Sequence, residues 1–293
     1  FENHRAADWT AELSQYVSFA LVVDGPPSFA YRLKRNEIPP DVSALAGFQA
    51  LMVRFEREAG LDELWKRAQP EYEAVIARYH EPVTRAVTTV SGYLRMEATG
   101  FRGWRFQVYV DLLAAPRQIQ TRSYGNETFV VATPSPEPQI NDIRHAYLHF
   151  LLDPLATRYA DEILKKKAVG DYALAAPYLD DIFKSDFLML AGECLIKAVE
   201  SRLEPGPPTA KQALVNQALA EGYILTPHFA EALAKFETQD VGIRLYYPEL
   251  ITSIDFRKEE KRLANYEFSS VRPVRKARET PRARPPEISP AEK

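Results

Sequence analysis

Residues Ile143–Leu152 read IRHAYLHFLL, and this stretch decides the expected fold and the expected chemistry. Two histidines, His145 and His149, stand four positions apart in a largely apolar segment. On an α-helix, residues four apart lie on one face, so both imidazole rings can reach the same metal ion. Two buried histidines without a metal would each need a separate hydrogen-bond partner. The spacing favours a metal site, while two unrelated core or surface histidines stay open as the alternative.

The segments around this helix predict a mixed fold. Trp104–Leu112 (WRFQVYVDL) alternates with period two and predicts a strand, as does the β-branched segment Glu127–Ala132 (ETFVVA). Pro116–Thr121 predicts a third strand, with Ser123–Asn126 as the turn between the last two. Further helices are predicted at Pro154–Lys167, Ala173–Tyr178, Leu188–Arg202, Ala210–Glu221 and Pro227–Phe236, with Tyr246–Ile254 left undecided. We therefore expect an α+β fold, mostly helical, with a small mixed sheet.

A strand followed by a His-x-x-x-His helix resembles the gluzincin class of zinc metallopeptidases, the thermolysin-like group. In that class an edge strand of a sheet lies beside a His-Glu-x-x-His helix, and a later helix supplies a glutamate ligand. The resemblance covers about residues 125–205. It implies a zincin-like domain, a zinc cofactor held by His145 and His149, and a peptide or protein substrate bound by strand addition at Glu127–Ala132.

Glu193 is the candidate third ligand. It lies in an otherwise apolar stretch, Leu190–Val199, and burying a carboxylate costs several kcal/mol unless it is paired or bound to a metal. An exposed helix glutamate is the alternative. Glu200, seven residues on, is a candidate to hold an imidazole N–H. Asp153 continues the histidine spacing and is a rival third ligand, but Pro154 follows it, so we expect Asp153 to end the helix or cap the next one. We prefer Glu193 as the ligand and keep Asp153 as an outer partner of the site.

Ala146 occupies the position at which the family carries its catalytic glutamate. That glutamate takes a proton from the attacking water and passes it to the leaving amine, and losing it costs about 10²–10⁴-fold in rate. Three explanations stay open: a natural pseudoenzyme, an engineered Glu→Ala change, or a substitute carboxylate such as Asp142 or Glu127. Hydrolysis is expected to be absent or weak.

The resemblance also suggests Tyr223 and His228 as oxyanion-stabilising groups, although ordinary helix-boundary residues are the competing interpretation. His80-Glu81 begins like the peptidase motif, but Thr84 stands where the second histidine is needed. We assign neither His80 nor His4 a role.

The organisation along the chain is expected to follow three parts: a mixed N-terminal lobe over 1–135, a helical lobe with the zinc site over 136–270, and a disordered tail or linker over 271–293. Within the first part, Tyr16–Asp24 predicts a buried strand. Helical spacing follows over residues 45–55, from Leu61, and over residues 71–94, where Pro82 is expected to interrupt or kink the helix.

The formal net charge of −3 in 293 residues predicts no general attraction to nucleic acid, and no apolar run is long enough to span a membrane. The single cysteine, Cys194, excludes an internal disulfide framework. The chain starts at Phe1, which suggests a removed leader and export to the periplasm or outside the cell, or merely a cloning boundary. The function class that competes with the peptidase-like one is a metal-free helical interaction domain.

Overall fold

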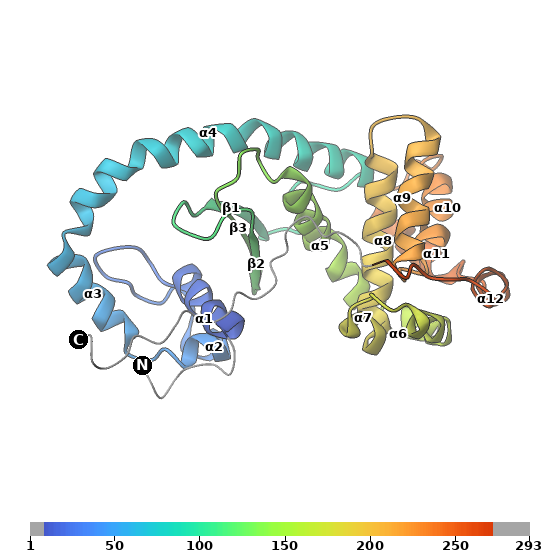
Figure 1. The fold of residues 1–293 in the computed structure, drawn as a ribbon, viewed down its shortest axis with the longest axis horizontal. Coiled ribbons are helices and arrows are strands. Elements are labelled where there is room, and N and C mark those ends of the chain that lie inside the picture. Colours follow the sequence, from blue (N-terminus) through green and yellow to red (C-terminus); the bar gives the residue numbers. More distant parts are fainter. Residues whose placement is uncertain (1–8, 272–293) are drawn as a thin grey trace. The chain divides into compact units, whose positions relative to one another are not determined.

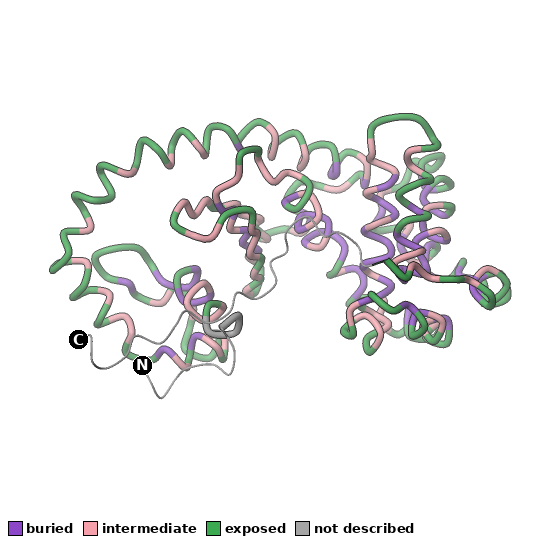
Figure 2. Tube along the Cα trace, in the orientation of Figure 1, coloured by how far each residue is buried: buried purple, intermediate pink, exposed green. Residues whose placement is uncertain are grey.

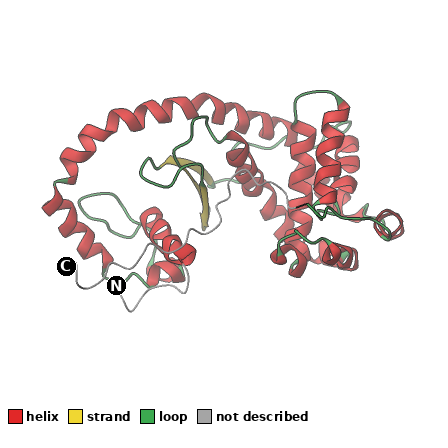
Figure 3. Ribbon diagram, in the orientation of Figure 1, coloured by secondary structure: helices red, strands yellow, loops and turns green. Residues whose placement is uncertain are grey.

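The structure, a computed structural model, describes residues 9–271. It is mostly helical with one small three-stranded mixed sheet, which agrees with the expected α+β class (Figure 1, Figure 3). The α-helices are α1 (Trp9–Val22), α2 (Pro40–Ser43), α3 (Phe48–Ala59), α4 (Leu61–Leu94), α5 (Ile140–Arg158), α6 (Ala160–Leu164), α7 (Asp181–Ser185), α8 (Phe187–Leu203), α9 (Pro208–Ala220), α10 (Thr226–Phe236), α11 (Ile243–Thr252) and α12 (Phe256–Leu263). Short 3-10 helices lie at Arg35–Glu37 (η2) and Lys167–Ala175 (η3).

The described chain forms two compact units, each with its own hydrophobic core. The first unit takes residues 9–79 and 107–137, and the second takes 80–106 and 138–271. The chain changes unit after Tyr79, after Phe106 and after Glu137. The tail expected at 271–293 lies, except for Val271, outside the described residues.

The sheet, mainly part of the first unit, has the strand order β1 (Arg105–Val110), β3 (Glu127–Ala132), β2 (Ile119–Tyr124). β2 and β3 pair antiparallel around a tight turn, with Ile119 opposite Ala132. The expectation that Glu127–Ala132 is an edge strand is wrong, because β3 is the central strand. Its backbone N–H and C=O groups are engaged on both sides, so a peptide cannot add to it.

The strand expected at Tyr16–Asp24 is also wrong, because this segment belongs to helix α1 up to Val22. Only Val23 makes an isolated β-bridge, to Tyr31. A short apolar run fits either a buried strand or a buried helix face, and packing decides between them. Here Phe19 is buried, and its ring packs edge-on against Phe48, with ring centroids 5.2 Å apart.

The interruption expected at Pro82 is absent, since α4 runs as one 34-residue helix that includes Pro70 and Pro82. A proline inside a helix removes one backbone hydrogen bond and costs about 3 kcal/mol. Burial of Val90 and Leu94 on the C-terminal part of α4 in the core of the second unit offsets this cost.

The second unit is a helical assembly built around α5 and α8. α5 carries buried apolar residues around most of its circumference, and the same is true of α8. α8 packs against α5, α9 and α10. Helices α9 and α10 run beside α8 in Figure 1. The buried positions in Figure 2 concentrate on these helices. The helices predicted at 188–202, 210–221 and 227–236 are confirmed to within two residues. The undecided segment 246–254 lies mostly in helix α11, and helix α12 was not predicted.

Among residues 9–271, no helix combines the length and apolar character that crossing a membrane requires.

Candidate metal centre

The two histidines and the glutamate lie together at the contact of α5 with α8. His145 and His149 project from α5, and Glu193 projects from the second turn of α8. One ligand atom from each of the three residues lies within 4.8 Å of the others. The side chain of Glu193 is only 7% exposed, so the carboxylate predicted to need a partner is indeed buried.

The separations of the three ligand atoms suit a small tetrahedral ion. The Nε2 atoms of His145 and His149 lie 3.2 Å apart. Glu193 Oε2 lies 3.3 Å from His149 Nε2 and 3.7 Å from His145 Nε2. Ligands that lie about 2.0–2.2 Å from a tetrahedral zinc ion are about 3.3–3.6 Å from one another. These residues therefore fit zinc with adjustments of a few tenths of an ångström.

Each imidazole is oriented by a carboxylate on its far side. His145 Nδ1 lies 3.1 Å from Glu200 Oε1, and His149 Nδ1 lies 3.1 Å from both carboxylate oxygens of Asp153. A neutral imidazole carries one N–H, and a neighbouring carboxylate selects Nδ1 for it. When both rings are neutral, both Nε2 lone pairs face the centre of the cluster, which is the arrangement that a metal needs.

Asp153 has this role because α5 does not stop before Pro154. The expectation that Asp153 ends the helix or caps the next one is wrong, since α5 continues to Arg158. The i to i+4 spacing of His149 and Asp153 places both side chains on one helix face. Asp153 and Glu200 thus each contact the Nδ1 atom of one of the two histidines.

The charges of the cluster couple His149 to Glu193. Burial alone would lower the pKa of His149, but hydrogen bonds and charges from Asp153 and Glu193 outweigh burial and raise that pKa to about 9. Burial alone would raise the pKa of Glu193, but the hydrogen bond from His149 and the charges of His145 and Lys197 lower it to about 2. The centre therefore attracts a positive charge, either a proton or a metal cation.

Lys197 is a member of this site that the sequence reasoning missed. It lies one turn after Glu193 on α8, and its Nζ is 3.3 Å from Glu193 Oε1. The same ammonium lies 4.3 Å from the centroid of the Tyr223 ring. The spacing Glu193-x-x-x-Lys197 is the available sequence signal, but on a helix it is usually an ordinary surface ion pair.

The other candidates are placed as follows. Ala146 is buried beside His145, at 5% exposure, and has no group that can take a proton. The Tyr223 ring contacts the ammonium group of Lys197, which in turn pairs with Glu193. The structure does not bring His228 into the cluster, because its Nε2 donates to the carbonyl of Leu250 3.0 Å away. Asp142 and Glu127 are not part of the three-residue group either.

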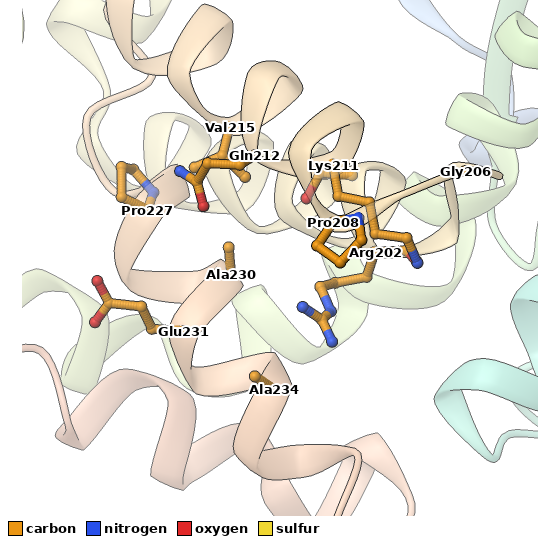
Figure 4. Close-up of a pocket in the computed structure, with 11 residues that line it drawn as sticks. Arg202, Gly206, Pro208, Lys211, Gln212, Val215, Pro227, Ala230, Glu231 and Ala234 are labelled. Carbon is orange, nitrogen blue, oxygen red and sulfur yellow. The ribbon is translucent and has the colours of Figure 1, made fainter.

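A pocket of about 490 Å³ lies elsewhere in the second unit, between the end of α8 and helices α9 and α10. Arg202 and Lys211 lie at one end and Glu231 at the other (Figure 4). All three are engaged: Arg202 with Glu237, Lys211 with the Arg202 carbonyl, and Glu231 with two cations of α12. No candidate metal-site residue lines this pocket.

Comparison with known proteins finds no family model, no curated protein and no solved structure that matches this chain.

Proposed function

We propose that this chain is a gluzincin-like zinc protein whose metal is held by His145, His149 and Glu193, and whose capacity for peptide hydrolysis is absent or weak. The observation that carries the proposal is the convergence of three ligand atoms at 3.2, 3.3 and 3.7 Å from one another. This convergence joins two helices, so it does not follow from the spacing of the histidines alone.

The negative charge around the two imidazoles supplies a further argument for a bound cation. Asp153 and Glu200 face the two Nδ1 atoms, and the buried carboxylate of Glu193 lies 3.3 Å from His149 Nε2. In the metal-free protein a proton on His149 offsets this charge. A divalent cation that displaces the proton would take its place between the three ligand atoms.

Zinc is the ion that this ligand set favours. Two imidazoles and one carboxylate form the His₂Glu set of catalytic zinc sites, in which three protein ligands leave a position for an exogenous group. Harder ions such as magnesium and calcium prefer sites made entirely of oxygen ligands. The zinc would supply Lewis acidity toward a carbonyl oxygen.

The residues of the chain itself limit the chemistry. Ala146 cannot accept a proton, so the step that the family assigns to its glutamate has no group at that position. Peptide binding without efficient turnover is then the best-supported role, and a peptide or protein is the ligand that the resemblance suggests. The binding surface is not β3, since that strand is paired on both sides.

A second candidate function is that of a metal-free interaction domain. Exposed apolar side chains on α3 and the start of α4 favour it: Leu51, Phe55 and Trp65 are each more than half exposed. Such residues are common at protein contacts. Metal content separates this function from the first.

The experiment measures the metal content of the purified chain after dialysis against a weak chelator. About one zinc per chain is expected, with loss in His149→Ala. His80→Ala is the matched control, because His80 is an exposed helix histidine that is not a member of the three-residue group. Equal zinc in all three proteins, or none in the unmodified chain, would leave the interaction domain as the better account.

A further inference from the structure

The two carboxylate oxygens of Glu193 face different cationic groups. Oε2 faces the histidine pair, at 3.3 Å from His149 Nε2. Oε1 lies 3.3 Å from Lys197 Nζ. Since the two oxygens of one carboxylate are covalently fixed to each other, whatever holds Oε1 also sets the orientation of Oε2.

Lys197 is itself held in place. Its ammonium lies over the face of the Tyr223 ring, 4.3 Å from the centroid, where the negative face of the ring attracts a cation. Tyr223 is buried, and its ring packs edge-on against Phe183. The Lys197 side chain is 23% exposed, so its charge is partly shielded from water. A solvated surface lysine would not be confined in this way.

We propose that Lys197 is a positioning residue that confines Glu193 to a one-oxygen binding mode toward the metal, so that an anionic ligand can share the site. The inference rests on the proposed function, because it concerns how this chain presents a ligand to a metal. It goes beyond the resemblance, which implies a glutamate ligand but assigns nothing to this lysine.

The physical reason is competition for Oε1. With the ammonium present, Oε1 has a charge-assisted partner and no cause to turn toward the histidines. Without it, a buried carboxylate oxygen loses its partner, and turning toward the metal to bind through both oxygens becomes the favourable way to satisfy it. The second oxygen would then occupy a position that an exogenous ligand needs, and the positive charge beside that ligand would be gone.

The test uses cobalt(II) in the full chain, with azide as the anionic probe. Lys197→Met removes the charge and keeps an apolar stem against Tyr223. Its cobalt protein should show weaker visible absorption, as expected for a higher coordination number, and about tenfold weaker azide binding, a typical effect of losing an outer partner. Lys197→Arg, which keeps a cationic donor, should restore most of both signals.

The matched control is Lys184→Met on α7. The Lys184 side chain is 21% exposed and pairs with Asp181 three residues before it, so it resembles Lys197 in burial and pairing but not in location. It should behave like the unmodified chain. Lys197→Gln keeps a neutral donor for Oε1 and guards against misfolding of the methionine variant; it should show the same change at smaller amplitude.

The outcomes separate the two claims. If the unmodified chain binds neither cobalt nor zinc, both the proposed function and the role of Lys197 are refuted. If it binds metal, but Lys197→Met and Lys197→Gln match it in both spectrum and azide affinity, the role of Lys197 is refuted and the metal site stands.

Discussion

His145 Nε2 and His149 Nε2 lie 3.2 Å apart, while the Nδ1 atom of each ring faces a carboxylate on the opposite side. The pair is therefore ordered from both directions before any ligand arrives. Such prior ordering reduces the conformational cost of binding, because the rings need not be reoriented.

Metal binding should displace a proton from His149. Because the carboxylates around it raise the pKa of this ring to about 9 in the metal-free protein, the ring is protonated at neutral pH, and the proton competes with the metal. Zinc affinity should therefore rise about tenfold per pH unit from pH 7 toward about 9 and level off above that. Calorimetry in two buffers of different ionisation enthalpy should give about one proton released per zinc at pH 7. Affinity that is constant between pH 7 and pH 8.5 would contradict this coupling.

Loss of either outer carboxylate should weaken metal binding without abolishing it. Asp153→Asn and Glu200→Gln keep the size of the side chain but make it a poorer acceptor for the imidazole N–H. Each should lower zinc affinity about 10–100-fold, the usual effect of removing an outer partner. Competition with a chromophoric chelator measures this. Asp181→Asn, which changes a fully exposed aspartate on α7, is the control and should leave the affinity unchanged.

Ala146→Glu should restore the missing proton acceptor if the likeness to gluzincins extends to catalysis. Hydrolysis of a quenched fluorescent peptide library should then rise about 10²–10⁴-fold above that of the unmodified chain. Ala146→Gln is the matched control, since it has the same shape but cannot act as a base. If the glutamate variant folds and binds zinc but cleaves no faster than the glutamine variant, the likeness to gluzincins is limited to the metal site and does not include catalysis.

Tyr147→Phe should destabilise the second unit. The Tyr147 hydroxyl donates to the Ala98 carbonyl at 2.6 Å and lies 2.7 Å from the Ser91 hydroxyl, and the side chain is 1% exposed. Phenylalanine leaves both groups short of a partner, at a cost of about 1–3 kcal/mol. Urea unfolding monitored by circular dichroism measures the loss. Tyr109→Phe, at a largely exposed tyrosine of β1, is the comparison and should change stability by less than about 0.5 kcal/mol.

The core of the candidate site follows from local sequence features. The histidine pair is visible because a helix repeats every 3.6 residues, and Glu193 is visible because a carboxylate among apolar residues is costly to bury. Lys197 could not be predicted as part of the site, because its role depends on the direction in which the Glu193 side chain points. The packing of α8 against α5 sets that direction. His228 was a plausible candidate by position, but α11 supplies a backbone acceptor for it instead.

The features of the fold that were wrongly predicted share one cause. Each of them depends on contacts between residues far apart in the sequence. The alternating pattern of a single strand does not show which other strands pair with it. The central place of β3 in the sheet therefore could not be predicted from its sequence. The segment 16–22 and the region around Pro82 are helical because their apolar residues find partners elsewhere in the unit, and this packing outweighs local propensity. In the second unit, α8, α9 and α10 were predicted to within two residues, whereas the helix expected at 173–178 lies partly in the 3-10 helix η3, which ends at Ala175.

The most direct test of the central claim is the anomalous scattering of a zinc-loaded crystal, measured on both sides of the zinc absorption edge. The account predicts one strong peak per chain, about 2.0–2.2 Å from the Nε2 atoms of His145 and His149 and from an oxygen of Glu193. No peak at that position, or zinc bound only elsewhere on the chain, would contradict it.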